Sequence, residues 1–130
     1  VGLAQRPLFK IAIANPEIAP YGELARQALK ASNLWDYFKN ALVFGDNAAQ
    51  AAFFAATNSV DAALLPCSLA QFSKLRDRGR VIEVSDKLYT RVAQAMVMLK
   101  KDSQSVISFF DFMQTTQVQQ LLLTNGYSLP

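Results

Sequence analysis

Short apolar runs alternate with helical patterns along the chain. Residues 9–14 are β-prone and nearly all apolar, which predicts a strand buried on both faces and ended by Asn15-Pro16. Later runs that also predict strands are residues 42–44, 62–65, 81–84 and 92–99. Residues 1–8 carry no periodic signal and are interpreted as a loop or arm.

Between these runs, apolar residues recur at the spacing of amphipathic helices. Pro20 suits a first helical position, and a second helix follows Asn47, which can cap it as Asp46 also can. Shorter helices are predicted over residues 34–41 and 68–75. Near the C-terminus, an apolar stripe runs over two further helices that end at Asn125-Gly126: Val106, Phe109, Phe110, Met113, Val118, Leu121 and Leu122. The alternation predicts the α/β class, with a mainly parallel sheet flanked by helices.

Composition narrows the possible functions. The chain has 130 residues, 52% of them hydrophobic, a mean hydropathy of +0.13 and a net charge of 13 − 10 = +3 without any histidine. This length is typical of one domain, and the apolar content argues against disorder. The single cysteine, Cys67, excludes an internal disulfide and is interpreted as a small buried hydrophobe. No apolar run reaches the length of a transmembrane helix.

No catalytic constellation emerges from the sequence. Without histidine there is no Ser-His-Asp or Cys-His set, and no glycine-rich phosphate loop occurs. The carboxylates show no paired spacing on one helix: Glu17, Glu23, Asp36, Asp46 and Asp61. The basic groups are interpreted as solvated turns: Lys100-Lys101 and Arg76, Arg78 and Arg80. We therefore expect no enzyme, no metal, no cofactor and no nucleic-acid partner.

Two strand-to-helix junctions, residues 15–22 and 45–50, are the candidates for ligand binding. In a parallel α/β sheet such junctions lie at the carboxyl ends of the strands, where ligands bind. A helix N-terminus offers N–H donors and the positive end of a dipole, so an oxyanion could bind there without Lys or Arg. The alternative is that both are ordinary capped connections, which every parallel α/β fold contains.

The same residues carry a resemblance to a known family. Residues 11–22, with the stretch Asn15-Pro16-Glu17 and Ala19-Pro20-Tyr21-Gly22, resemble the segment that opens the second lobe of periplasmic molybdate-binding proteins of ABC transporters. Further segments resemble that family in the same order: residues 33–36, 43–50, 61–68, 109–113 and 125–130. The similarity covers nearly the whole chain from residue 9 onward.

The resemblance implies a periplasmic-binding-protein type II lobe that holds molybdate or tungstate through backbone N–H groups. Carried over by position, these contacts fall on Tyr21 and Ala48, with Pro20 and Asn47 beside them in the candidate site. Some family members add a tyrosine hydroxyl where this chain has Pro66, which lacks both hydroxyl and N–H. The implied partners are the small oxyanion and a membrane permease, and the implied location is periplasmic or extracytoplasmic.

The resemblance also implies a division of the chain. Residues 9–86 correspond to the second ligand-binding lobe, and residues 87–130 to the returning inter-lobe strand and to C-terminal helices that pack on the first lobe. The first lobe that precedes this segment in the family has no counterpart in these 130 residues, and the opening Val1-Gly2-Leu3 is typical of a processed, trimmed or excised piece. The apolar stripe would then either fold back on this lobe or pair with a second copy of the chain.

Two other functions remain open at this point. One is a diverged stand-alone domain that binds no oxyanion and acts through protein–protein contacts. The other is the effector-sensing lobe of a transcription regulator, although the sequence contains no helix-turn-helix segment.

Overall fold

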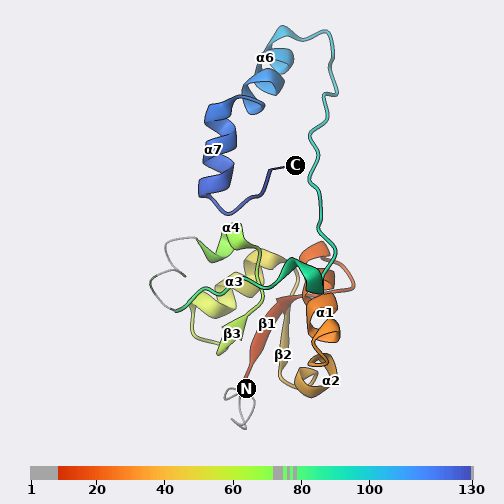
Figure 1. The fold of residues 1–130 in the computed structure, drawn as a ribbon, viewed down its shortest axis with the longest axis vertical. Helices are drawn as coiled ribbons and strands as arrows, with labels where there is room; N and C mark the ends of the chain where they lie inside the picture. The colour runs from red at the N-terminus through yellow and green to blue at the C-terminus, as the bar shows by residue number, and fades with distance from the viewer. Residues whose placement is uncertain (1–8, 72–74, 76, 78, 130) are drawn as a thin grey trace. The chain divides into compact units, whose positions relative to one another are not determined.

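The computed structural model describes residues 9–71, 75, 77 and 79–129 (Figure 1). The chain divides into two compact units, Val1–Arg91 and Val92–Pro130, and each is considered by itself. The loop or arm predicted over residues 1–8 lies outside the described residues, as do Arg76, Arg78 and part of the helix predicted over residues 68–75.

A parallel sheet of three strands forms the centre of the first unit. The strands are β1 (Ile11–Ala14), β2 (Leu42–Gly45) and β3 (Ala62–Ala63), in the order β2-β1-β3. The register places Ile11 beside Leu42 and Ala62, and Ala14 beside Gly45. The predicted α/β class with a parallel sheet is therefore confirmed, and the apolar run at residues 9–14 does form the buried central strand.

The described helices follow the strands in the predicted alternation. In the first unit they are α1 (Pro20–Ala31), α2 (Trp35–Phe38), α3 (Ala48–Ala56), α4 (Cys67–Ala70) and the 3₁₀ turn η2 (Asp86–Leu88). The second unit contains α6 (Gln104–Met113) and α7 (Thr116–Thr124). α1 begins at Pro20 and α7 is followed by Gly126 at φ 82°, both as predicted.

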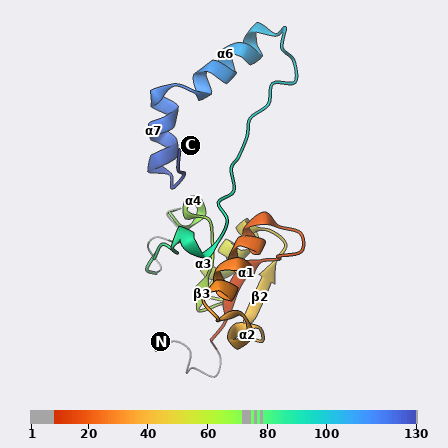
Figure 2. The same cartoon turned by 45° about the vertical axis from the view of Figure 1, so that its right-hand side comes forward.

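The two faces of β1 pack against different helices. Phe9, Ile11 and Ile13 form a buried cluster with Ala25 of α1. Partly buried side chains surround this cluster: Trp35, Phe38, Leu42, Ala62 and Leu64. Ala12 and Ala14 point to the opposite face because side chains alternate along a strand. That face is covered by α3, so α1 and α3 lie on opposite sides of the sheet (Figure 2).

Two predicted strands are wrong. Residues 81–84 and 92–99 have no strand geometry, although the first is rich in β-branched residues and the second is mostly apolar. A strand requires a hydrogen-bonded neighbour, and among the described residues the sheet ends at β2 and β3. Without that partner the side chains stay largely in water: Ile82 is 71% exposed and Val97 is 73% exposed.

The helices of the second unit bury only part of their apolar stripe. Val118 is buried, and four others are half-buried: Val106, Phe110, Met113 and Leu122. Phe109 and Leu121 remain exposed, at 58% and 62%. Pairing of this stripe with a second copy of the chain stays a prediction.

Gly22 allows α1 to start directly against the end of β1. A Cβ atom at this position would lie 2.2 Å from the carbonyl oxygen of Ala14 and 2.7 Å from the carbonyl carbon of Asn15. Both contacts are with backbone, so no flexible side chain can move away. Gly45 plays the same part for α3, since its Cβ would lie 2.8 Å from the backbone nitrogen of Ala51.

We therefore expect Gly22→Ala to lower the free energy of unfolding by about 1–3 kcal/mol, the usual cost of overpacking, or by more. Urea unfolding followed by circular dichroism measures this change. Gly79→Ala is the matched control, because a Cβ at Gly79 meets nothing within 4 Å. Equal stability of the two variants would show that α1 does not depend on this close approach.

Candidate anion-binding site

The two candidate junctions lie side by side at one edge of the sheet. Ala14 and Gly45 are register partners at the carboxyl ends of β1 and β2, and the N–H of Asn15 donates to the carbonyl of Gly45 at 2.7 Å. From there the chain enters α1 on one face and α3 on the other (Figure 1). Adjacent strands whose connections leave to opposite faces form the switch point at which open α/β sheets bind ligands.

The first junction is a tight loop folded around Asn15. The N–H of Glu17 donates to Asn15 Oδ1 at 3.0 Å, and the N–H groups of Ile18 and Ala19 donate to the Asn15 carbonyl. Ala19 is the extended N-cap residue of α1. Pro20 occupies the first helical position and has no N–H, so Tyr21 supplies the first amide of the helix.

The second junction is capped as the sequence predicts. Asn47 Oδ1 accepts from the N–H of Gln50 at 2.9 Å, and Gln50 Oε1 accepts from the N–H of Asp46 at 2.5 Å. Within the part of the chain that the structure describes, the N–H groups of Ala48 and Ala49 have no acceptor. Ala48 is half-buried and Ala49 is exposed, so these amides are available to a ligand. The family resemblance implies a contact at Ala48, and the adjacent Ala49 is a further candidate that it did not name.

The third strand-to-helix junction, between β3 and α4, offers less to a ligand than the first two. Pro66 is the N-cap residue of α4, and its carbonyl accepts from the N–H groups of Leu69 and Ala70. Its ring can donate nothing to a ligand. Cys67 follows it and is exposed, so the interpretation of this cysteine as a buried hydrophobe is wrong. Cys67 is the first residue of α4 and lies beyond the end of β3 at Ala63.

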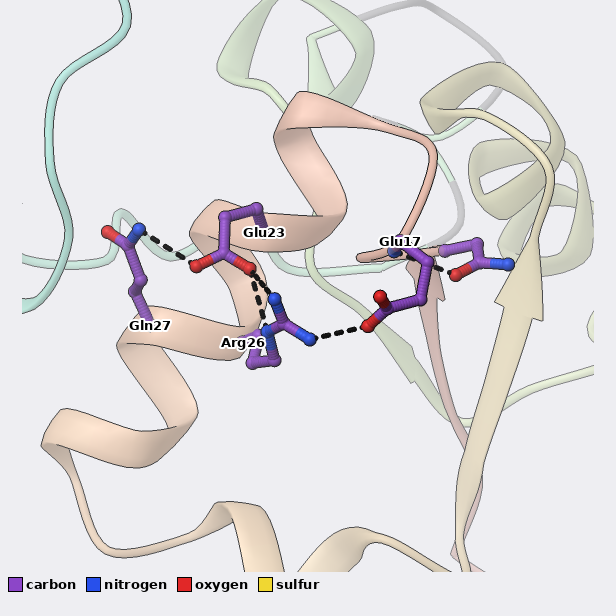
Figure 3. Close-up of polar contacts among 5 residues, drawn as sticks. Glu17, Glu23, Arg26 and Gln27 are labelled. Carbon is purple, nitrogen blue, oxygen red and sulfur yellow. Dashed lines mark hydrogen bonds and ion pairs between the residues drawn. The ribbon is translucent and has the colours of Figure 1, made fainter.

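A polar network links the first junction to α1 (Figure 3). Arg26 Nη1 donates to Glu17 at 2.6 Å, and Arg26 Nε donates to Glu23 at 2.7 Å. Gln27 Nε2 donates to the other oxygen of Glu23 at 3.0 Å, while Gln27 Oε1 accepts from the N–H of Thr90 at 2.9 Å. The sequence pattern indicated no pairing for Glu17 or Glu23. The spacing of Glu23, Arg26 and Gln27 on one helix is the signal that predicts the part of the network within α1.

This network shifts the pKa values of Glu23 and Arg26. The hydrogen bond from Gln27 lowers the pKa of Glu23 below its ordinary 4.5, partial burial opposes this shift, and Arg26 lowers the pKa further. The hydrogen bond to Glu23 raises the pKa of Arg26, against desolvation and with help from Glu17. Glu23 and Arg26 are therefore both charged near neutral pH.

Other candidate chemistry lies away from the junctions. Asp61 Oδ2 accepts from the N–H of Lys10 at 2.8 Å, which gives this carboxylate a structural role. A shallow hollow near the end of α1 is lined by Lys30, Asn33, Trp35 and Asp36. Among the described residues, no group of three or more His, Cys, Asp or Glu side chains could hold a metal ion. No described helix combines the length and apolar character needed to cross a membrane.

Comparison with known proteins adds independent information. Residues 2–128 match the family model described as bacterial extracellular solute-binding protein. The curated relatives include the molybdate-binding protein ModA of Azotobacter vinelandii, 30% identical over 121 residues that cover 92% of this chain and 48% of the relative. ModA of Rhodobacter capsulatus is 27% identical, with 90% of this chain and 46% of the relative covered. A putative ABC transporter substrate-binding lipoprotein of Bacillus subtilis, YvgL, is 24% identical, with 92% and 46% covered.

Solved structures share the fold. The periplasmic molybdate-binding protein of Azotobacter vinelandii superposes with a TM-score of 0.76 at 23% identity, covering 98% of this chain and 57% of that chain. A substrate-binding domain of a putative molybdenum ABC transporter from Clostridium difficile gives 0.72 at 20% identity, covering 98% and 56%. The chain spans about half the length of the curated relatives it matches.

We expect Asn47→Ala to lower the free energy of unfolding by about 1 kcal/mol, because it removes the side-chain cap of α3. Asn47→Ser keeps an oxygen that can accept from Gln50 and is expected to cost much less. Urea unfolding of the two variants measures the difference. Equal losses would contradict a capping role for Asn47.

The carboxyl of Glu23 is expected to titrate below 4.5, and Gln27→Met is expected to raise its pKa towards that value. Because the folded-state pKa is depressed, the stability contributed by ionised Glu23 is present above the unfolded pKa and is lost as pH falls through the folded pKa. Carboxyl ¹³C shifts recorded across an acid titration measure the pKa. Gln119→Met, on α7, is the control and is expected to leave it unchanged.

Proposed function

Because the chain belongs to the bacterial extracellular solute-binding protein family, we propose that it forms part of the solute-binding component of an ABC importer. The ligand proposed is a tetrahedral oxyanion such as molybdate or tungstate, and the role is binding rather than catalysis. The names of the relatives support both a role in an ABC importer and molybdate as the ligand. The proposed partner is a membrane permease, and the proposed place of action is periplasmic or extracytoplasmic.

The observation that supports an anionic ligand is that two helix N-termini meet at one edge of the sheet. α1 and α3 begin beyond strand ends that are neighbours in the register. Each N-terminus carries a partial positive charge and presents backbone N–H groups, so an oxyanion between them is stabilised by both. The proposed donors are the N–H groups of Tyr21 and Ala48, joined by that of Ala49.

Neutral donors suit a ligand of this kind. Pro20 and Asn47 shape the two helix starts, and neither contributes a charge. Backbone amides are fixed by the fold, so they lose little conformational freedom when an anion binds. The Tyr21 ring is not required for this contact, because its N–H belongs to the helix.

On its own, this set of donors surrounds only one side of an anion. Each further hydrogen bond to a charged group contributes about 1.5–3 kcal/mol, so enclosing the other side would raise the affinity by orders of magnitude. We therefore expect this chain alone to bind an oxyanion weakly, with dissociation constants above the micromolar range.

A second candidate function is favoured by the helices of the second unit. Phe109, Phe112 and Leu121 are 58%, 48% and 62% exposed. Apolar side chains gathered in this way often mark a protein interface. This candidate is a domain of the same fold that binds no oxyanion and acts through protein–protein contacts.

A titration with sodium molybdate, followed by ¹H–¹⁵N NMR, separates the two functions. Oxyanion binding is expected to shift the amide signals of Tyr21, Ala48 and Ala49, and sodium chloride at equal ionic strength is expected not to. Sodium sulfate and tungstate, titrated in the same way, report the preference among tetrahedral anions. Shifts confined to other regions would contradict the proposed site, and micromolar binding would contradict the one-sided geometry.

Ala48→Pro tests the donor itself. Proline is favourable at the first helical position and removes only the N–H, and the extended Asn47 before it (φ −151°, ψ 174°) already has a conformation that proline accepts. We expect molybdate binding to weaken by about tenfold or more, the loss of one hydrogen bond to a charged group. Ala48→Ser and Tyr21→Phe keep their amides and are the controls, expected to bind as the unaltered chain does.

A further inference from the structure

The loop of residues 15–19 is held by backbone hydrogen bonds at its two ends, while its tip depends on a side-chain contact. Its internal bonds end on Asn15, and the Ala19 carbonyl accepts from the N–H groups of Gly22 and Glu23 at the start of α1. Ile18 is 65% exposed and gives the loop no apolar anchor. The ion pair between Glu17 and Arg26 joins the tip of the loop to the body of α1.

Several contacts fix the Arg26 side chain beside the loop. Its side chain is 28% exposed, and its guanidinium contacts Glu23 through Nε and Nη2 while Nη1 reaches Glu17 (Figure 3). Glu23 is itself fixed by Gln27, and Gln27 accepts from the N–H of Thr90. An isolated surface ion pair contributes little, but a planar guanidinium held in a network of this kind has one orientation.

Charge gives Arg26 a second effect. Glu17 lies in the loop that leads to the proposed donor Tyr21, and its side chain is 74% exposed. An unpaired carboxylate there would repel a dianion. The guanidinium of Arg26 offsets this charge without itself being part of the helix start.

We propose that Arg26 is a positioning residue: through Glu17 it orients the loop of residues 15–19 and so sets the N-terminus of α1 for an anion. The effect of Arg26 on the loop exists in the chain without ligand, whereas a role of the loop in anion binding rests on the proposed function.

Amide hydrogen exchange of the free chain tests the positioning. In Arg26→Met, exchange of the Glu17, Ile18 and Ala19 amides is expected to rise about fivefold, the scale of a surface ion network. Arg26→Lys is expected to restore part of the protection, since lysine keeps the charge but lacks the planar guanidinium that holds Glu17 and Glu23 in one fixed geometry. Lys30→Met removes a cation of the same helix that lies over the Trp35 ring instead of the loop, and it is expected to leave the loop unchanged.

A double-mutant cycle with Glu17→Gln shows whether Arg26 acts through Glu17. The effect of Arg26→Met on the loop is expected to disappear in the Glu17→Gln background. Unchanged exchange in Arg26→Met, or an undiminished effect in the double variant, would overturn the proposal.

Molybdate titration of the same variants separates this proposal from the proposed function. Weaker binding in Arg26→Met with unchanged binding in Lys30→Met supports use of the positioned loop. If the unaltered chain shows no molybdate shifts, the proposed function fails, while the exchange data still decide the role of Arg26.

Discussion

The close approach of two helices to the ends of two parallel strands is the constraint on which the rest of the fold depends. Gly22 and Gly45 have no Cβ, and each stands where a Cβ would collide with backbone. Because of this, α1 packs against the end of β1 once the loop of residues 15–19 has folded back, and α3 begins at Ala48, close beyond Gly45. The same absence of side chains brings the amides of both helix starts to one edge of the sheet. Packing and the candidate site therefore have a common cause, and a change that relaxes one would displace the other.

Sequence patterns predicted the elements whose causes are local. The apolar run at residues 9–14 is long enough to be recognised as a buried strand, Pro20 can begin a helix, and Asn47 can cap one. Each of these properties depends on a few neighbouring residues. The junctions at residues 15–22 and 45–50 came from the same local logic, and the family resemblance then implied contacts at Tyr21 and Ala48.

The features that the sequence did not predict depend on distant partners. Residues 81–84 and 92–99 have strand-like composition, but a strand exists only where another strand pairs with it. Burial of Cys67 failed for the same reason, because it depended on packing that the short strand β3 does not supply. The contact of Arg26 with Glu17 bridges a loop and a helix, and the bond from Thr90 to Gln27 joins residues far apart in the chain.

A site built from backbone amides differs from one built from charged side chains in what it demands of the protein. Amides do not titrate near neutral pH, and the chain has no histidine that could change charge there. Their direction is set by helix axes, so recognition depends on where the helices begin more than on which side chains they carry. The side chains around them then act indirectly: Asn47 and Gln50 fix one helix start, and Arg26 and Glu17 bear on the other. Apart from proline, which removes the amide itself, substitutions of the residues whose amides face the ligand should therefore alter such a site less than substitutions of the residues that place the helices.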